Sequence, residues 1–99
     1  MSRIVTPSSA ITTLVRAGTD MTLRQIAVLA GVVETHGQSV GHLAKHLGIQ
    51  KPCVTRAVDT LTADGYVTRT VAANDRRQVS IVATKPGVAL VRRMDGRAA

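Results

Sequence analysis

Apolar residues recur along this chain at the three- and four-residue spacing that places them on one face of an α-helix. The stretches with this pattern are residues 6–18, 22–34, 39–64 and 84–95. Between the last two, Val, Ile and Thr alternate with polar residues over 66–71 and 78–83, which predicts two β-strands joined as a hairpin. We therefore expect a mainly helical chain with one small hairpin near its end.

The first predicted helix carries a narrow apolar stripe. Thr6 is its expected N-cap, Pro7 its first residue and Gly18 its stop. The stripe consists of Ile11, Leu14 and Val15.

The second predicted helix begins with a capping box, because the side chains of Thr22 and Gln25 are spaced to satisfy each other's backbone N–H groups. The helix runs to about Glu34 and is apolar almost all round. Such a helix is either the buried centre of a domain or partly a docking surface, and the buried centre is favoured.

Residues 39–64 predict two short helices joined by a tight turn. Ser39 caps the first, Gly48 ends it, and the second runs from about Gln50 to Asp64. The inward-facing residues of the second are Val54, Ala57, Val58 and Leu61. Its opposite face carries Lys51, Cys53, Thr55, Arg56, Asp59 and Thr60. Two helices of this kind form a helix-turn-helix pattern.

The predicted hairpin encloses a short polar loop in which Asp75 directly precedes Arg76 and Arg77. Guanidinium groups at a hairpin tip have no apolar surface to cover, which makes them candidates for contact with an anion.

Thr84 then caps the last predicted helix. The apolar residues of that helix include Val88, Val91 and Met94. This order of elements predicts a winged helix-turn-helix, a single domain over 1–99 that is mainly α with a small β-hairpin wing (α+β).

The charge balance points to a polyanionic partner. Thirteen Lys and Arg against six Asp and Glu give a net charge of +7 and a pI of about 11.2. Tyr66 is the only Phe, Tyr or Trp residue. The chain therefore has too few aromatic side chains to bind single-stranded nucleic acid by stacking on its bases. Duplex nucleic acid, an acidic membrane surface or an acidic protein surface remain as partners.

We expect a cytoplasmic, nucleoid-associated protein, and three further features favour the cytoplasmic location. A single cysteine forms no internal disulfide, which suits a reducing compartment. The longest apolar run, residues 26–33, is too short to span a bilayer, so we expect no membrane partner. The N-terminus also lacks the apolar segment of a signal peptide.

Several motifs follow one another at characteristic separations. They are "HLAKHLGI" in the first helix of the helix-turn-helix, "VTRAVDTL" in the second, "DGYV" before the hairpin, Asp75 with Arg77, and Thr84 with Gly87. Through them the chain resembles, from residue 22 to about 94, the MarR family of bacterial winged-helix transcriptional regulators. The resemblance implies a protein that binds double-stranded DNA and regulates transcription.

The resemblance also implies which residues meet DNA. The second helix of the motif would enter a major groove, which is about 12 Å wide. The matching positions are Gln50, Lys51, Pro52, Thr55 and Arg56, with Ser39 at the start of the helix before. Arg56 is a candidate for a bidentate contact with guanine, and its alternative is a solvated or phosphate-paired arginine. Gln50 is suited to adenine, and Thr55 to a thymine methyl or a phosphate.

The wing has a corresponding role in the family. The second arginine of its motif, here Arg77, would enter the minor groove with Asp75 orienting it, and Arg76 would meet phosphate. The alternative is a solvated turn in which Asp75 bonds only to the backbone.

Other chemistries are less well supported. His42 and His46 have a spacing that can hold a metal, but no obvious third ligand accompanies them, so a solvated or phosphate-facing surface and no metal are expected. Cys53 lies near Lys51 and Arg56, and packing near DNA is favoured over redox sensing. No carboxylate pair or phosphate-binding loop is evident, so we expect neither an enzyme nor a cofactor.

The leading hypothesis is a sequence-specific double-stranded DNA-binding regulator, expected to be a repressor. One alternative is a protein-interaction module that binds another regulator or polymerase, and another is a low-specificity architectural DNA-binding protein. The chain ends shortly after Thr84, where family members continue into long dimer-forming helices. We therefore expect a short form close to a bare DNA-binding lobe, in which the usual dimer interface and the binding of a small-molecule effector are doubtful. We still expect a homodimer. Its predicted interface consists of Ile11, Leu14, Val15, Val88, Val91 and Met94.

Overall fold

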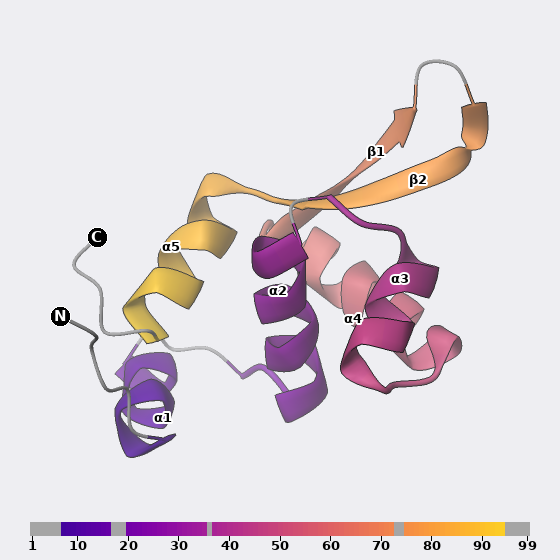
Figure 1. Cartoon of the computed structure of the whole chain (residues 1–99). Helices are drawn as coiled ribbons and strands as arrows, with labels where there is room; N and C mark the ends of the chain where they lie inside the picture. The colour runs from indigo at the N-terminus through magenta and orange to yellow at the C-terminus, as the bar shows by residue number, and fades with distance from the viewer. Residues whose placement is uncertain (1–6, 17–19, 36, 73–74, 95–99) are drawn as a thin grey trace, which may run out of the picture.

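The fold is a small helical bundle with a projecting hairpin. The computed structural model describes residues 7–16, 20–35, 37–72 and 75–94, and within these ranges the side chains of 7–10, 72 and 75–78 are not described. The elements in order are α1 (Pro7–Arg16), α2 (Leu23–Thr35), α3 (Val40–Leu47), α4 (Lys51–Ala63), β1 (Val67–Ala72), β2 (Asp75–Ala83) and α5 (Lys85–Met94) (Figure 1). The predicted fold class, mainly α with a two-stranded wing, is confirmed.

Local sequence signals set most of the helix ends. Thr22 N donates to Gln25 Oε1 and Gln25 N to Thr22 Oγ1, each at 3.1 Å, which confirms the capping box. Ser39 Oγ accepts from His42 N at 3.1 Å at the start of α3. Gly48 ends that helix in the left-handed conformation, with φ of 68°. The ends predicted for the first helix, Thr6 and Gly18, lie outside the described residues.

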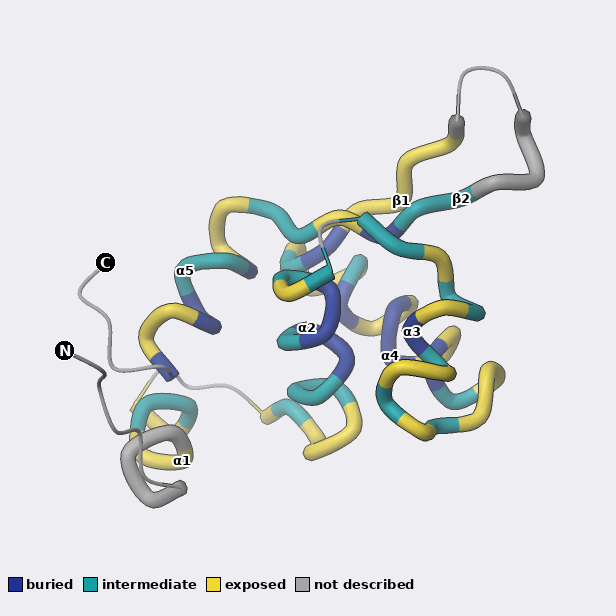
Figure 2. Tube along the Cα trace, in the orientation of Figure 1, coloured by how far each residue is buried: buried dark blue, intermediate teal, exposed yellow. Residues whose placement is uncertain are grey.

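Helix α2 is the centre of the domain, as its all-round apolar sequence predicted. Val28, Leu29 and Val32 are at most 1% exposed, and α2 contacts α3, α4, α5 and β2. Figure 2 shows the buried middle of α2 between α5 on one side and α3 with α4 on the other. Its first residue, Leu23, is 84% exposed, so only the body of the helix belongs to the core.

The core extends from α2 to both sides. Its remaining buried apolar members are Leu43, Val54, Ala57, Val58, Leu61, Val67, Ile81, Leu90, Val91 and Met94. The inward-facing set predicted for α4 is therefore buried as a whole. Because α4 packs directly on α2, the outer face of α4 is left for solvent or a partner.

Helices α1 and α5 pack against each other at the end of the molecule away from the wing (Figure 1). Val91 and Met94, which we expected on an exposed apolar surface, are instead buried in the core of the single chain. Leu14 packs partly against the same core, and Val88 is half-buried. The reason is that α5 packs against α1 and α2, and of the α1 stripe only Leu14 turns toward this core.

The exposed apolar residues at this end belong to α1. Ile11 is 58% exposed and Val15 is 70% exposed. They are the members of the predicted dimer interface that remain accessible in one chain.

The wing differs from its prediction in one respect. Strand β2 begins at Asp75, so Asp75, Arg76 and Arg77 lie in a strand rather than in the loop between two strands. The antiparallel register runs from Val67 opposite Ala83 to Val71 opposite Val79, and then shifts so that Ala72 pairs with Asp75. An irregularity of this kind adds unpaired residues to one strand, which local alternation does not reveal.

The base of the wing is tied to the segments next to α3 and α4. Ile81 N donates to Gln38 O at 2.9 Å, which joins β2 to the segment before α3. Thr84 N donates to Tyr66 O at 3.0 Å, and the Thr84 hydroxyl donates to Gly65 O at 2.6 Å. The wing is thereby anchored to the helix-turn-helix.

The Thr84–Gly87 motif has a packing function at this junction. Thr84 Oγ1 accepts from Gly87 N at 3.3 Å and so caps α5, as predicted. A Cβ added at Gly87 would lie 2.2 Å from Tyr66 O, a distance that real Cβ atoms do not show. Glycine at this position lets α5 approach the backbone that leads into β1.

Candidate nucleic-acid interface

The first turn of α4 presents polar side chains to solvent. Gln50, its N-cap, has an extended backbone and makes no side-chain cap hydrogen bond, so its amide is not engaged at the helix end. Lys51 and Pro52 follow, and no acidic residue lies in this turn. Because a helix N-terminus carries a partial positive charge, this end of α4 is suited to an anion.

The five positions of α4 and its N-cap that the family resemblance expects to meet DNA are all exposed. They are Gln50, Lys51, Pro52, Thr55 and Arg56. Thr55 Oγ1 donates to Lys51 O at 3.1 Å, so its hydroxyl proton is held within the helix and its methyl group is free for contact. The outer face of α4 is therefore available to a partner.

An open cleft of about 480 Å³ lies beside this turn, between α3, α4 and the wing. We call it the α3–wing cleft, and it is lined by Gly37, Gln38, Ser39, Val40, Gly41, Lys51, Val79 and Ser80. It brings two predicted residues, Ser39 and Lys51, to one surface. Ser39 Oγ already accepts from His42 N, and its hydroxyl proton can still be offered to a ligand.

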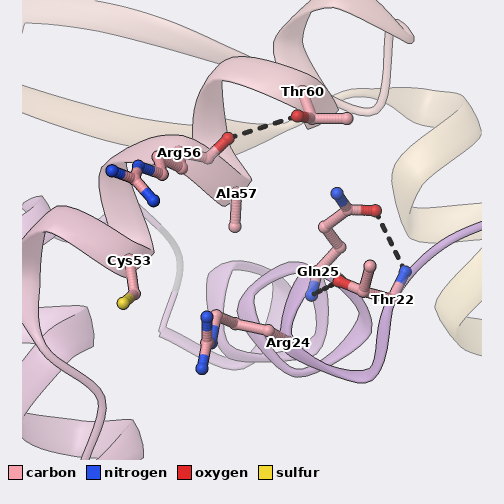
Figure 3. A pocket seen from close by; sticks show the side chains of 7 residues that line it. All are labelled: Thr22, Arg24, Gln25, Cys53, Arg56, Ala57 and Thr60. Carbon is pink, nitrogen blue, oxygen red and sulfur yellow. Dashed lines mark hydrogen bonds between the residues drawn. The ribbon is translucent and has the colours of Figure 1, made fainter.

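A second open cleft, of about 410 Å³, lies between the start of α2 and α4. We call it the α2–α4 cleft, and it is lined by Thr22, Arg24, Gln25, Cys53, Arg56, Ala57 and Thr60 (Figure 3). The sequence analysis missed Arg24, because nothing local indicates that the first turn of α2 lies beside α4. The cluster exists only through the packing of the two helices.

One ion pair joins α4 to the wing. Arg69 of β1 donates through Nη2 to Asp59 Oδ1 of α4, and both side chains are partly exposed. Asp59 was predicted on the outer face of α4, but its partner was not, since the two residues belong to different elements.

The predicted wing residues begin strand β2. The backbone of Asp75, Arg76 and Arg77 is in β2, but their side chains lie outside what the structure describes. Their expected contacts with the minor groove and with phosphate stay predictions.

The histidines of α3 lie on its exposed face. The rings of His42 and His46 are stacked with centroids 6.3 Å apart, and His46 Nε2 lies 3.8 Å from Glu34 Oε2. Within residues 7–16, 20–35, 37–72 and 75–94, no three or more His, Cys, Asp or Glu side chains gather as they would around a metal ion. Over the same residues, no helix has the length and apolar character needed to cross a membrane.

Comparison with known proteins places this geometry among transcriptional regulators. A family model described as MarR family matches residues 19–78. The transcriptional regulator Tm0710 from Thermotoga maritima is similar at a TM-score of 0.78 and 31% identity, over 91% of this chain and 62% of that protein. RV1404 from Mycobacterium tuberculosis is similar at a TM-score of 0.81 and 22% identity, over 90% of this chain and 60% of that protein.

A mutant of MepR from S. aureus, solved bound to an oligodeoxyribonucleotide, has the same fold. Its TM-score is 0.79 at 24% identity, with 90% of this chain and 64% of that chain covered. The present chain thus spans less than two thirds of the length of each of these structures.

Proposed function

Because the chain belongs to the MarR family, we propose that it regulates transcription by binding specific sequences of double-stranded DNA. The observation that carries the proposal is the exposed first half of α4, which is free of acidic residues in its first turn and stands beside the wing. The net charge of +7 supplies the long-range attraction to a polyanion. A protein of the same fold, MepR, was solved bound to an oligodeoxyribonucleotide, which supports the assignment.

In the proposed complex, α4 enters the major groove and its N-terminus points toward a phosphate. Gln50, whose amide makes no cap bond, reads adenine, and the Thr55 methyl group meets a thymine methyl. The wing lies over the adjacent minor groove, where Arg77 enters, Asp75 orients it and Arg76 meets phosphate. Bound at an operator, the protein acts as a repressor by occupying DNA that polymerase needs.

Two copies read one operator in this proposal. A single lobe covers only a few base pairs, and two lobes on half-sites about 34 Å apart give useful selectivity. The exposed Ile11 and Val15 of α1 are the apolar residues through which the two copies meet. The contact does not need the buried Val91 and Met94.

The test is a binding titration against a pool of random duplexes, followed by measurement of the selected sites at several salt concentrations. If about four phosphates are neutralised per lobe, log K falls with log salt at a slope of about −3.6. A steep slope with equal affinity for all sequences would assign the protein to architectural DNA binding. Absence of binding at low salt would reject DNA as the partner and leave a protein-interaction module.

A further inference from the structure

The α2–α4 cleft is lined by two arginine side chains from different helices. Arg24 comes from the first turn of α2 and Arg56 from α4, and both guanidinium groups extend to the same side of the cleft (Figure 3). Among the described residues, neither arginine forms an ion pair, and no acidic residue lines the cleft. Two positive charges that line one cleft are each stabilised by an anion bound there.

The cleft also offers neutral hydrogen-bond donors. Gln25 uses Oε1 to accept from Thr22 N, which leaves its amide N–H₂ free. Thr22 uses its hydroxyl oxygen to accept from Gln25 N, which leaves its hydroxyl proton free. The lining thus supplies donors and positive charge, which suits an oxyanion.

The position of the cleft on α4 indicates which oxyanion. Successive residues of an α-helix turn by about 100°, so Lys51 projects from nearly the opposite flank of α4 to Cys53 and Thr60. Lys51 lines the α3–wing cleft, whereas Cys53 and Thr60 line the α2–α4 cleft. The exposed face that carries Pro52 therefore has one cleft on each flank.

DNA has a matching arrangement. A helix with its side chains is about 10–12 Å across and the major groove is about 12 Å wide, so a helix that fills the groove has a sugar–phosphate backbone on each side. With α4 in the groove, the α3–wing cleft, with Lys51 and Ser39, would face one of them. We propose that the α2–α4 cleft takes a phosphate of the other backbone, held by Arg24 and Arg56, so that α2 is a further DNA-contacting element.

This inference rests on the proposed DNA binding and refines it. It assigns Arg56 to a phosphate rather than to guanine, because its side chain lines the cleft beside Arg24. Phosphate contacts fix the register of a protein on its site without reading sequence. Arg24 and Arg56 thus orient α4 so that Gln50 and Thr55 meet the bases.

The test compares Arg24→Ala and Arg56→Ala with Arg92→Ala, which removes the same charge from an exposed position of α5 that lines neither cleft. Affinity for the selected duplex is measured by fluorescence anisotropy over a range of salt. We expect the two cleft variants to bind about tenfold more weakly at moderate salt and to lower the slope of log K against log salt by about 0.9, with unchanged sequence preference. Arg24→Lys, which keeps the charge, should recover most of the loss.

A second experiment locates the contact. Duplexes with one neutral methylphosphonate at a time should identify a phosphate whose neutralisation weakens the parent protein but has no added effect on Arg24→Ala. An Arg24→Ala protein that binds like the parent at every salt concentration overturns the inference and leaves the proposed function standing. A parent that binds no duplex overturns both.

Two further outcomes count against the phosphate clamp. If Arg56→Ala relaxes preference at one base pair, Arg56 reads a base and the two arginines do not share a phosphate. If inorganic phosphate raises the melting temperature of the parent but not of Arg24→Ala, while both bind DNA equally, the cleft takes a free anion instead. Far-UV circular dichroism of each variant checks that the fold is kept.

Discussion

Arg69 in β1 donates a hydrogen bond to Asp59 in α4, and the pair joins the wing to the helix proposed to enter the major groove. Asp59 lies on the exposed side of α4, where its carboxylate would otherwise repel the phosphates of DNA. The guanidinium of Arg69 compensates this charge and at the same time ties the base of β1 to α4.

We therefore expect Arg69→Ala to weaken DNA binding by more than the loss of one distant charge, because it leaves the Asp59 carboxylate unpaired. Asp59→Asn in the same protein should recover much of the affinity. Stability to urea should fall by less than about 1 kcal/mol, since both side chains are partly exposed. Equal affinity of the single and the double variant would show that the charge of Asp59 does not matter to DNA.

Gly87→Ala should destabilise the fold strongly. The new methyl group would lie 2.2 Å from the backbone oxygen of Tyr66, which cannot move without shifting the wing. Overpacking of this kind costs about 1–3 kcal/mol or more, measured by urea unfolding. Gly41→Ala is the matched control, because its Cβ meets only Ser39 Oγ, at 3.9 Å, and helix propensity favours Ala by up to about 1 kcal/mol. A similar effect of both substitutions would contradict the packing function of Gly87.

Charged substitutions in α1 and α5 should distinguish residues needed for folding from residues needed for dimerisation. Val91→Asp places a carboxylate in the core, where the side chain is 7% exposed, and is expected to unfold the protein. Val15→Asp changes a side chain that is 70% exposed and should leave the fold intact while lowering the dimer population. Light scattering at several protein concentrations measures the dimer population. An unchanged molecular mass for Val15→Asp would exclude this part of α1 from the contact.

Arg77→Ala tests the wing. If Arg77 enters a minor groove, its loss should weaken binding and flatten the preference for A·T pairs at the flanks of the site, where that groove is narrow. Selection of bound sequences from a random pool gives both quantities. Preference that stays unchanged at the flanks would assign Arg77 to sequence-independent contact with phosphate.

Local signals in the sequence predicted the elements well. The Thr22–Gln25 capping box, the Ser39 cap, the Gly48 stop and the apolar face of α4 all depend on residues within one turn or one helix. The fold class followed from their order. The motif around Thr84 was also recognised, although its physical reason, the contact of Gly87 with Tyr66, joins residues that are distant in sequence.

The errors and omissions came from contacts between elements. The burial of Val91 depends on the packing of α5 against the core and α1, which no helical period reveals. The start of β2 at Asp75 depends on an irregular register with β1. The cleft that Arg24 and Arg56 share and the pair of Arg69 with Asp59 likewise arise only when the helices and the wing are assembled.

The junction between α4, the wing and α5 has a practical consequence. Tyr66 lies there half-buried, its backbone oxygen accepts from Thr84, and the chain contains no Trp or Phe. The ultraviolet fluorescence of the unmodified protein therefore comes from a single phenol ring. A tilt of the wing or of α5 would change the surroundings of this ring. The chain carries its own optical reporter, and a change in its intensity or anisotropy can time such a movement without a label.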